Sequence, residues 1–147
     1  AMELDKIDLS LIKLLQQHSK VGLKELAEHV GLTPTPVHER IKRLERNGVI
    51  SRYSIVVNEE KLGRGLLVLC NVQLKSHSLT NLEEFEAEIV KIKEVVSCYH
   101  IAGNYDYLLT LRMKDMEEYG NFVKGKLASI PHIAQVQSSF VMRDIKA

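Results

Sequence analysis

Residues 23–48 read LKELAEHVGLTPTPVHERIKRLERNG and decide the fold of the first part of the chain. Apolar residues recur at helical spacing on both sides of Gly31, which suits the left-handed position that ends a helix. Two short helices joined by such a tight turn are typical of a helix-turn-helix. The second helix of this motif commonly enters the DNA major groove, so the segment predicts DNA binding.

The second helix has two candidate starts within the pattern TPTP. Thr33 or Thr35 can supply the N-cap, and Pro34 or Pro36 fits the first turn because an N–H there has no helical partner. The pattern leaves both starts open. Gly48 is expected to end this helix by the same left-handed capping as Gly31.

The second helix also separates apolar from polar side chains. Val37, Ile41 and Leu44 recur at i, i+4 and i+7, so this side is predicted to pack inward. The other side chains project outward or lie on the flanks, and several of them are basic. The candidate DNA-binding residues are Thr33, Thr35, Pro36, His38, Glu39, Arg40, Lys42, Arg43 and Arg46.

An ordinary helical hairpin with a solvated, charged surface is the alternative interpretation of this segment. A third amphipathic stripe ahead of it favours a DNA-binding domain, because three helices can close a small core. Asp5 is placed either to cap that first helix or to favour its positive end. The stripe consists of Leu4, Ile7, Leu11, Leu14 and Leu15.

The net charge of the chain is only +1, so the basic residues that matter are local ones. Residues 1–52 carry nine Lys and Arg against seven Asp and Glu, whereas residues 53–147 carry eleven against twelve. Residues 40–52 hold five of these cations, enough for several phosphate contacts per subunit. We expect tight binding to double-stranded DNA to need more than one subunit.

Composition restricts the class of protein. The chain has 147 residues, of which 45% are apolar and 27% charged, as in soluble globular domains. It contains no apolar run of about eighteen residues and no secretory signal pattern, so we expect a cytoplasmic, nucleoid-associated protein with no membrane partner. Cys70 and Cys98 lie in apolar runs and are expected to be reduced structural thiols, and the six histidines show no metal-ligand spacing.

The pattern changes from helical to strand spacing after residue 48. We expect a helix-turn-helix DNA-binding domain at 1–52, an extended linker at 53–65, and a ligand-binding and oligomerisation domain at 66–147. In the last of these, the predicted strands are 66–75, 95–102, 105–113 and 133–142, and the predicted helices are 82–93 and 116–130.

Local signals support these elements of the second domain. The patterns Thr80-x-x-Glu83 and Asp115-x-x-Glu118 are capping boxes at the starts of the two helices. Gly103-Asn104 is a two-residue hairpin signal, so the second and third strands should be antiparallel neighbours. The resulting order βαββαβ predicts an α+β, ferredoxin-like fold with both helices on one face of a four-stranded sheet.

The other face of that sheet would remain uncovered. Side chains alternate along a strand, so the apolar residues of the first and third strands cannot all point toward the helices. A symmetric homodimer that packs sheet on sheet would bury the rest and present two recognition helices. The apolar residues concerned are Leu67, Leu69, Val72, Leu74, Leu109 and Leu111.

Four motifs make the chain similar to a known family. They are LDKID at 4–8, GLTPTP at 31–36, ERIKRLE at 39–45 and GNYDYL at 103–108. With these motifs the whole chain resembles the Lrp/AsnC family, the feast/famine transcription regulators of bacteria and archaea. The resemblance implies an N-terminal winged helix-turn-helix, a C-terminal βαββαβ ligand-binding domain, and dimers that assemble into octamers.

The resemblance also implies a free amino acid as effector, bound between dimers near the hairpin loop and the last strand. We expect no cofactor. Backbone N–H groups of a glycine turn can bind its carboxylate, and Asp106 can accept its ammonium. Without the resemblance, Asp106 is more simply a residue that caps the turn. The residues implied for the ligand are Gly103, Asn104, Tyr105, Asp106, Ser138 and Ser139.

The expected function is therefore a sequence-specific transcriptional regulator whose assembly or DNA binding responds to an amino acid. A nucleoid-packing protein of low sequence specificity is the alternative. An enzyme that uses His100, Tyr105 and Asp106 is a weaker one, because no nucleophile, phosphate loop or metal set accompanies them. The sequence leaves open the effector, the sign of regulation, the operator and the oligomer order.

Overall fold

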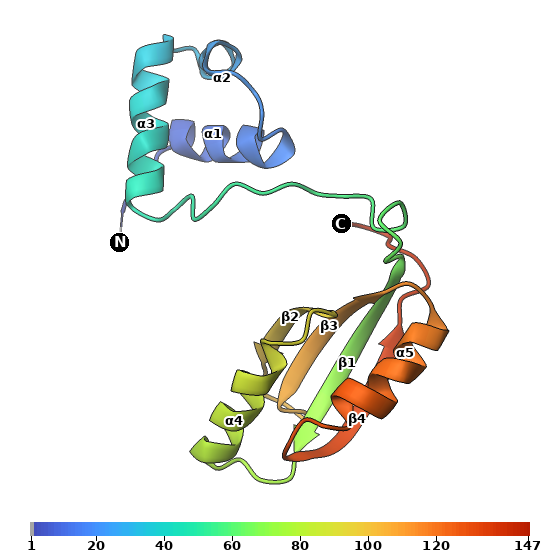
Figure 1. Ribbon diagram of the computed structural model, residues 1–147. Coiled ribbons are helices and arrows are strands. Elements are labelled where there is room, and N and C mark those ends of the chain that lie inside the picture. Colours follow the sequence, from blue (N-terminus) through green and yellow to red (C-terminus); the bar gives the residue numbers. More distant parts are fainter. Residues whose placement is uncertain (1) are drawn as a thin grey trace. The chain divides into compact units, whose positions relative to one another are not determined.

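The computed structural model describes residues 2–147, which fold as two compact units divided between Val57 and Asn58 (Figure 1). The N-terminal unit contains three helices, α1 (Lys6–Gln17), α2 (Leu23–Val30) and α3 (Pro34–Arg46). Their inward sides form a small core in which Val37 and Leu44 are completely buried, as their spacing predicted. The core cluster consists of Leu11, Leu26, Ala27, Val37 and Ile41.

Each helix of this unit begins or ends where a local signal predicted. Asp5 caps α1 in a capping box, because its carboxylate accepts from Asp8 N at 2.8 Å while the Asp8 carboxylate accepts from Asp5 N at 3.2 Å. Gly31, with φ 71°, ends α2. Thr33 is the N-cap of α3, so the helix begins at Pro34 and the choice between two starts is settled. Its hydroxyl makes no capping hydrogen bond.

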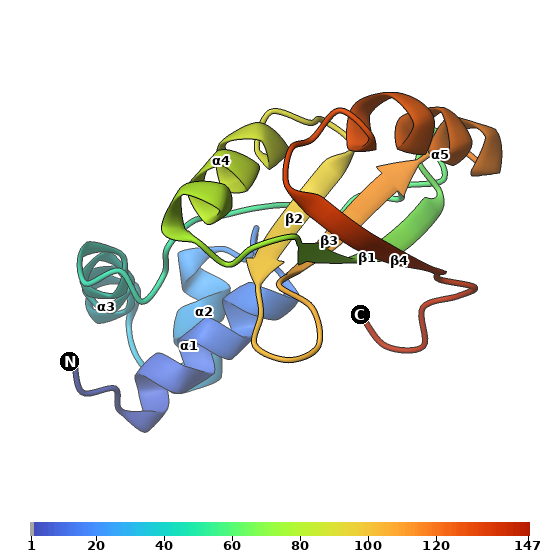
Figure 2. The ribbon, with the colours of Figure 1, turned by 90° about the horizontal axis from the view of Figure 1, so that it is seen from below.

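The C-terminal unit is one antiparallel sheet with two helices on one face. Its strands are β1 (Leu66–Leu74), β2 (Val95–His100), β3 (Tyr107–Met113) and β4 (Ile133–Phe140), in the order β2-β3-β1-β4. The helices are α4 (Leu79–Ile89) and α5 (Met116–Phe122), and α5 continues as a π-helical turn at Val123–Leu127. Figure 2 shows both helices on the same side of the sheet, which confirms the ferredoxin-like prediction.

Alternation along the strands divides the apolar residues of the sheet as expected. Val72, Leu74, Leu109 and Leu111 all face the helices and are buried. Leu67 and Leu69 point to the opposite face, which no element of this unit covers. Other residues on that face are Tyr99, Leu108, Thr110, Gln137 and Ser139.

Two local predictions for this unit were wrong. Ser78 rather than Thr80 caps α4, because the Ser78 hydroxyl accepts from Asn81 N at 3.3 Å and the helix begins earlier than the Thr80 pattern implied. The β2–β3 connection is also not a two-residue hairpin. It spans residues 101–106, because Asp106 N donates to Val72 O at 2.9 Å and so binds the end of the loop to β1.

Candidate functional site

The structure divides the predicted DNA-binding residues of α3 into two groups. The first group is exposed on the outer side of the helix and free to meet a ligand. Lys42 belongs to it, although its ammonium lies 3.6 Å from the Glu45 carboxylate. The exposed members are Thr33, Thr35, Pro36, His38, Glu39, Lys42 and Arg46.

The second group, Arg40 and Arg43, is bound to α1. Arg40 Nη1 lies 2.7 Å from Asp5 Oδ2 and 3.0 Å from Asp8 Oδ1, and Arg43 Nη2 lies 2.8 Å from Asp8 Oδ2. Only 1% of the Asp8 side chain is exposed, so both arginines meet a buried carboxylate. These two guanidinium groups therefore connect the first and third helices.

These contacts shift two ionisation equilibria. The hydrogen bond from Asp8 N, and then that from Arg40, hold the pKa of the Asp5 carboxyl below its ordinary value of 3.8. The hydrogen bonds to Asp5 and Asp8 raise the pKa of Arg40 above its ordinary value. Both shifts favour the charged forms of Asp5 and Arg40.

In the C-terminal unit the structure brings part of the predicted effector group together. Gly103 has φ 143°, a conformation that favours glycine, in the loop before β3. Tyr105 donates its hydroxyl proton to Gln137 Oε1 at 2.6 Å, which joins this loop to β4. Ser139 shares the sheet face of Gln137, because the two are separated by one residue on the strand.

Ser138 does not join this group. Its register partner is Cys70, and its hydroxyl accepts from Tyr119 at 2.6 Å and lies 3.7 Å from the Cys70 sulfur. These contacts lie on the helix side of the sheet, opposite to Ser139. Two neighbouring serines of one strand therefore face two different environments.

The Asp106 carboxylate already has partners within the chain. One oxygen accepts from Leu74 N at 2.8 Å, and the other lies 3.0 Å from His77 Nε2. Only 15% of the Asp106 side chain is exposed, whereas 69% of His77 is. Asp106 therefore fastens the loop to the end of β1 and still presents one edge beside an exposed imidazole.

Sequence reasoning missed Gln137 and His77 in this neighbourhood. The strand period carried a signal for Gln137, because it shares the side of Ser139 and not that of Ser138. No comparable local signal marked His77, which lies between β1 and α4 and meets Asp106 through tertiary contact alone.

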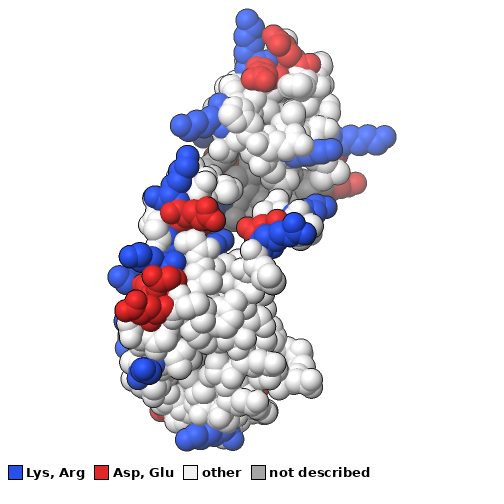
Figure 3. All heavy atoms as spheres, turned by 90° about the vertical axis from the view of Figure 1, so that its right-hand side faces the viewer, with Lys and Arg blue, Asp and Glu red and all other residues white. Residues whose placement is uncertain are grey.

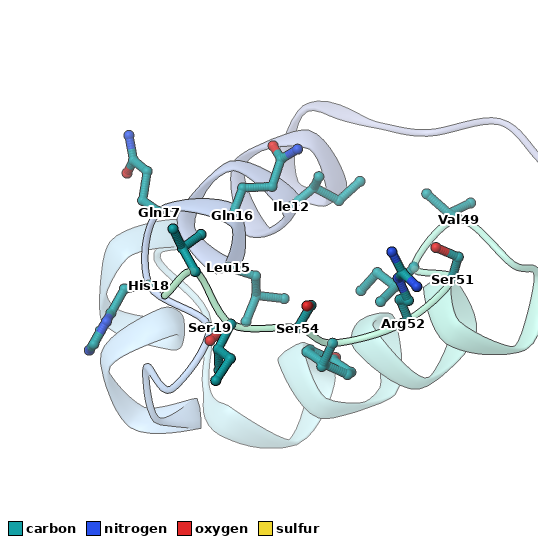
Figure 4. A pocket seen from close by; sticks show the side chains of 14 residues that line it. Ile12, Leu15, Gln16, Gln17, His18, Ser19, Val49, Ser51, Arg52 and Ser54 are labelled. Atoms are coloured by element: carbon teal, nitrogen blue, oxygen red, sulfur yellow. The ribbon is translucent and has the colours of Figure 1, made fainter. Parts of the chain in front are cut away.

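Two hollows lie apart from this loop. One, of about 510 Å³, lies in the N-terminal unit between the end of α1 and the extended segment after α3. Figure 4 shows Leu15 on the α1 side of this hollow and Arg52 and Ser54 on the side of the extended segment. The other, of about 610 Å³, lies between α5 and β4, with Lys75 and Ser138 in its lining. Residues 103–106 line neither hollow, so neither completes the predicted effector group.

Within residues 2–147, no group of three or more His, Cys, Asp and Glu side chains is arranged to hold a metal ion. None of the helices there combines the length and apolar character needed to cross a membrane.

Comparison with known proteins covers both units. A winged helix-turn-helix DNA-binding model matches residues 4–51, and the Lrp/AsnC ligand binding domain model matches residues 67–147. The chain is 38% identical to the DNA-binding transcriptional activator DecR of Escherichia coli K12 over 97% of this chain and 94% of that protein. It is 37% identical to the leucine-responsive regulatory protein of Haemophilus influenzae over 97% of this chain and 86% of that one.

Solved structures agree with these matches. A transcriptional regulator of Neisseria meningitidis, crystallised with L-Met, superimposes with a TM-score of 0.93 at 34% identity, over 99% of this chain and 94% of that one. An AsnC family transcriptional regulator from Agrobacterium tumefaciens superimposes with a TM-score of 0.91 at 33% identity, over 98% of this chain and 94% of that one. With a helix-turn-helix unit followed by a matching ligand-binding unit, the chain belongs to the Lrp/AsnC family of transcriptional regulators.

Proposed function

We propose that this protein regulates transcription by inserting α3 into the DNA major groove, in a manner that responds to a free amino acid. The observation that carries the proposal is the exposed outer side of α3, held by a capped three-helix unit in a regulator family. Thr35, Pro36, His38 and Glu39 lie in its first half, where base contacts are made in this motif. Lys42 and Arg46 then supply phosphate contacts.

The proposed assembly is a homodimer, with octamers as the higher state that the family resemblance implies. The uncovered sheet face with Leu67, Leu69 and Leu108 supports sheet-on-sheet pairing, because exposed apolar area tends to be buried by association. The view of the C-terminal unit in Figure 3 also contains a broad area without charged side chains. We place the protein on the nucleoid in the cytoplasm, without a membrane partner.

The proposed effector is an apolar amino acid, bound at the loop with Gly103, Asn104, Tyr105 and Asp106. Gln137 and Ser139 complete the group from β4 in preference to Ser138, because they share its side of the sheet. The L-Met complex of the Neisseria relative supports this class of ligand. We propose no cofactor and no catalytic role, since the matched relatives are regulators.

A thermal-shift panel with all twenty amino acids tests the effector. A ligand at a hundred times its Kd adds about 2.7 kcal/mol of stability, so a true effector should raise the melting temperature clearly. Asp106→Asn should remove the shift, because it deletes the charge that faces the ammonium yet keeps an oxygen for Leu74 N. Asp144→Asn makes the same charge change outside the loop and should keep the shift. An unchanged response in Asp106→Asn would contradict the assigned site.

A DNA-binding assay tests the regulator itself. A preferred site selected from a random DNA pool should bind about a thousandfold more tightly than unselected DNA at the same salt concentration. Similar affinity for both pools would instead support a packing protein of low specificity.

A further inference from the structure

Half of the basic residues on α3 are bound to acidic residues of α1. The helix carries Arg40, Lys42, Arg43 and Arg46, and the first and third of these lie against Asp5 and Asp8. An inference about their effect on DNA rests on the DNA binding proposed above.

The Asp8 carboxylate is the centre of this cluster. Oδ1 accepts from Arg40 at 3.0 Å, and Oδ2 accepts from Arg43 at 2.8 Å and from Asp5 N at 3.2 Å. A carboxylate of which only 1% is exposed is costly to bury without such partners. Both oxygens of Asp8 are therefore occupied by groups of its own unit.

The two arginines depend on Asp8 to different degrees. Arg40 has a second partner in Asp5 at 2.7 Å, whereas Asp8 is the one acidic partner of Arg43 in residues 2–147. Arg43 Nε is buried and has no hydrogen-bond acceptor within those residues. The Arg43 side chain therefore has fewer of its hydrogen-bond donors paired than a fully bonded guanidinium would. The side chain as a whole is 43% exposed for Arg43 and 25% exposed for Arg40.

Free arginines on a recognition helix strengthen binding to any DNA. Contacts to phosphates carry no sequence information, and each one neutralised adds to affinity at low salt for every sequence. Arginines that are paired with acidic residues at α1 do not contribute to this phosphate-binding affinity. They also fix the position of α3 relative to α1, which determines where its first turns meet the bases.

We infer that Asp8 is a positioning residue that sets DNA specificity, because its buried carboxylate withholds Arg40 and Arg43 from the phosphate backbone and fixes α3 against α1. Loss of its charge frees Arg43 completely and leaves Arg40 with Asp5 as its single acidic partner. Affinity for unselected DNA then rises more than affinity for the preferred site, and discrimination falls.

The test is a salt series for full-length wild type and Asp8→Asn on selected and unselected DNA. For the variant, we expect at least tenfold tighter binding to unselected DNA at low salt. The plot of log K against log salt should steepen by roughly one to two, since each phosphate contact contributes about 0.9. The matched control is Glu3→Gln, which makes the same charge change at an exposed residue with no ion pair in the described chain. A folded Asp8→Asn that behaves like Glu3→Gln overturns the inference.

Two further variants keep the test decisive. In the double variant Asp8→Asn with Arg43→Gln, the increase in the salt slope should fall by half or more, because the one cation that Asp8→Asn frees completely is gone. If circular dichroism shows that Asp8→Asn does not fold, Arg43→Gln is compared with Arg46→Gln in the wild-type background. Arg43→Gln should reduce the slope by less than half as much as Arg46→Gln, and an equal reduction overturns the inference. A wild type that binds no DNA would overturn the proposed function instead.

Discussion

Each unit of the protein buries one carboxylate among the residues that the structure describes, and the two carboxylates have different partners. Asp8 of the N-terminal unit binds two arginines of α3, the helix that faces DNA in our proposal. Glu94 of the C-terminal unit binds Lys126 in the π-helical turn, with Nζ 2.5 and 2.8 Å from its two oxygens. Neither residue of that pair belongs to the loop at 103–106, where we propose the effector site.

In the N-terminal unit, the buried carboxylate that stabilises the fold also contacts the helix that we propose binds DNA. In the C-terminal unit, the buried carboxylate and the proposed effector residues are separate groups. In our proposal, a change at Asp8 alters the packing of α3 against α1 and also the charges available to DNA. A change at Glu94 alters the attachment of the π-helical turn, whereas the loop at 103–106 is held by Asp106 instead. The surrounding apolar cores differ as well, since the N-terminal cluster is much smaller than the C-terminal one.

The largest effect should come from Leu11→Ala. Leu11 is fully buried, and such a truncation costs about 2–5 kcal/mol. Because the N-terminal core is small, we expect this unit to unfold at room temperature and DNA binding to be lost. Calorimetry should show the loss of one transition.

Leu109→Ala is the matched change in the other unit, where Leu109 is also fully buried. It should lower the transition of the C-terminal unit by a similar free energy and leave that unit folded. A single transition that shifts equally in both variants would show that the two cores unfold together.

A smaller effect is expected when Glu94 loses its partner. Lys126→Met leaves a nearly buried carboxylate without its cation and should cost about 1–2 kcal/mol, because half of the Lys126 side chain is exposed. Urea unfolding measures this cost. Lys124→Met, in the same turn but exposed and without an ion pair in the described residues, should be near neutral. Equal effects of the two substitutions would mean that the ion pair is not what stabilises the turn.

The N-terminal unit was predictable almost residue by residue because its signals are local. Asp5, Gly31 and Gly48 each lie at a helix end and act through the nearest few backbone groups. The same reasoning identified Asp115, whose carboxylate accepts from Glu118 N at 2.9 Å. Caps of this kind need no knowledge of the rest of the fold.

The details that were missed depend on contacts distant in sequence. The loop at 101–106 is longer than a tight hairpin because Asp106 binds Val72 and Leu74 of β1. The attachment of Arg40 and Arg43 to α1 could not be predicted from the sequence either, because their partners lie more than thirty positions away. Helical spacing shows which side of α3 is polar and leaves open whether its cations face solvent or another helix.

The Asp5 carboxyl gives a pH test that is confined to the N-terminal unit. Its pKa in the folded protein is lowered from 3.8, so the ionised form stabilises the fold above that pH. The contribution should disappear as the pH falls through the lowered pKa. The melting temperature of wild type minus that of Asp5→Asn should therefore be constant from pH 7 to 5 and shrink toward zero below pH 3.8. A difference independent of pH would contradict this assignment.

The smallest effect concerns the two thiols, which both lie in the C-terminal unit. Burial, and then the Glu86 charge, raises the pKa of Cys98 to about 11, and burial raises the pKa of Cys70. Little thiolate exists at pH 8, so modification by iodoacetamide should be slow in the folded protein. Opening of this unit should then accelerate the labelling. Leu109→Ala should accelerate labelling and Leu11→Ala should not, and acceleration by Leu11→Ala would show that loss of the N-terminal core also opens the sheet.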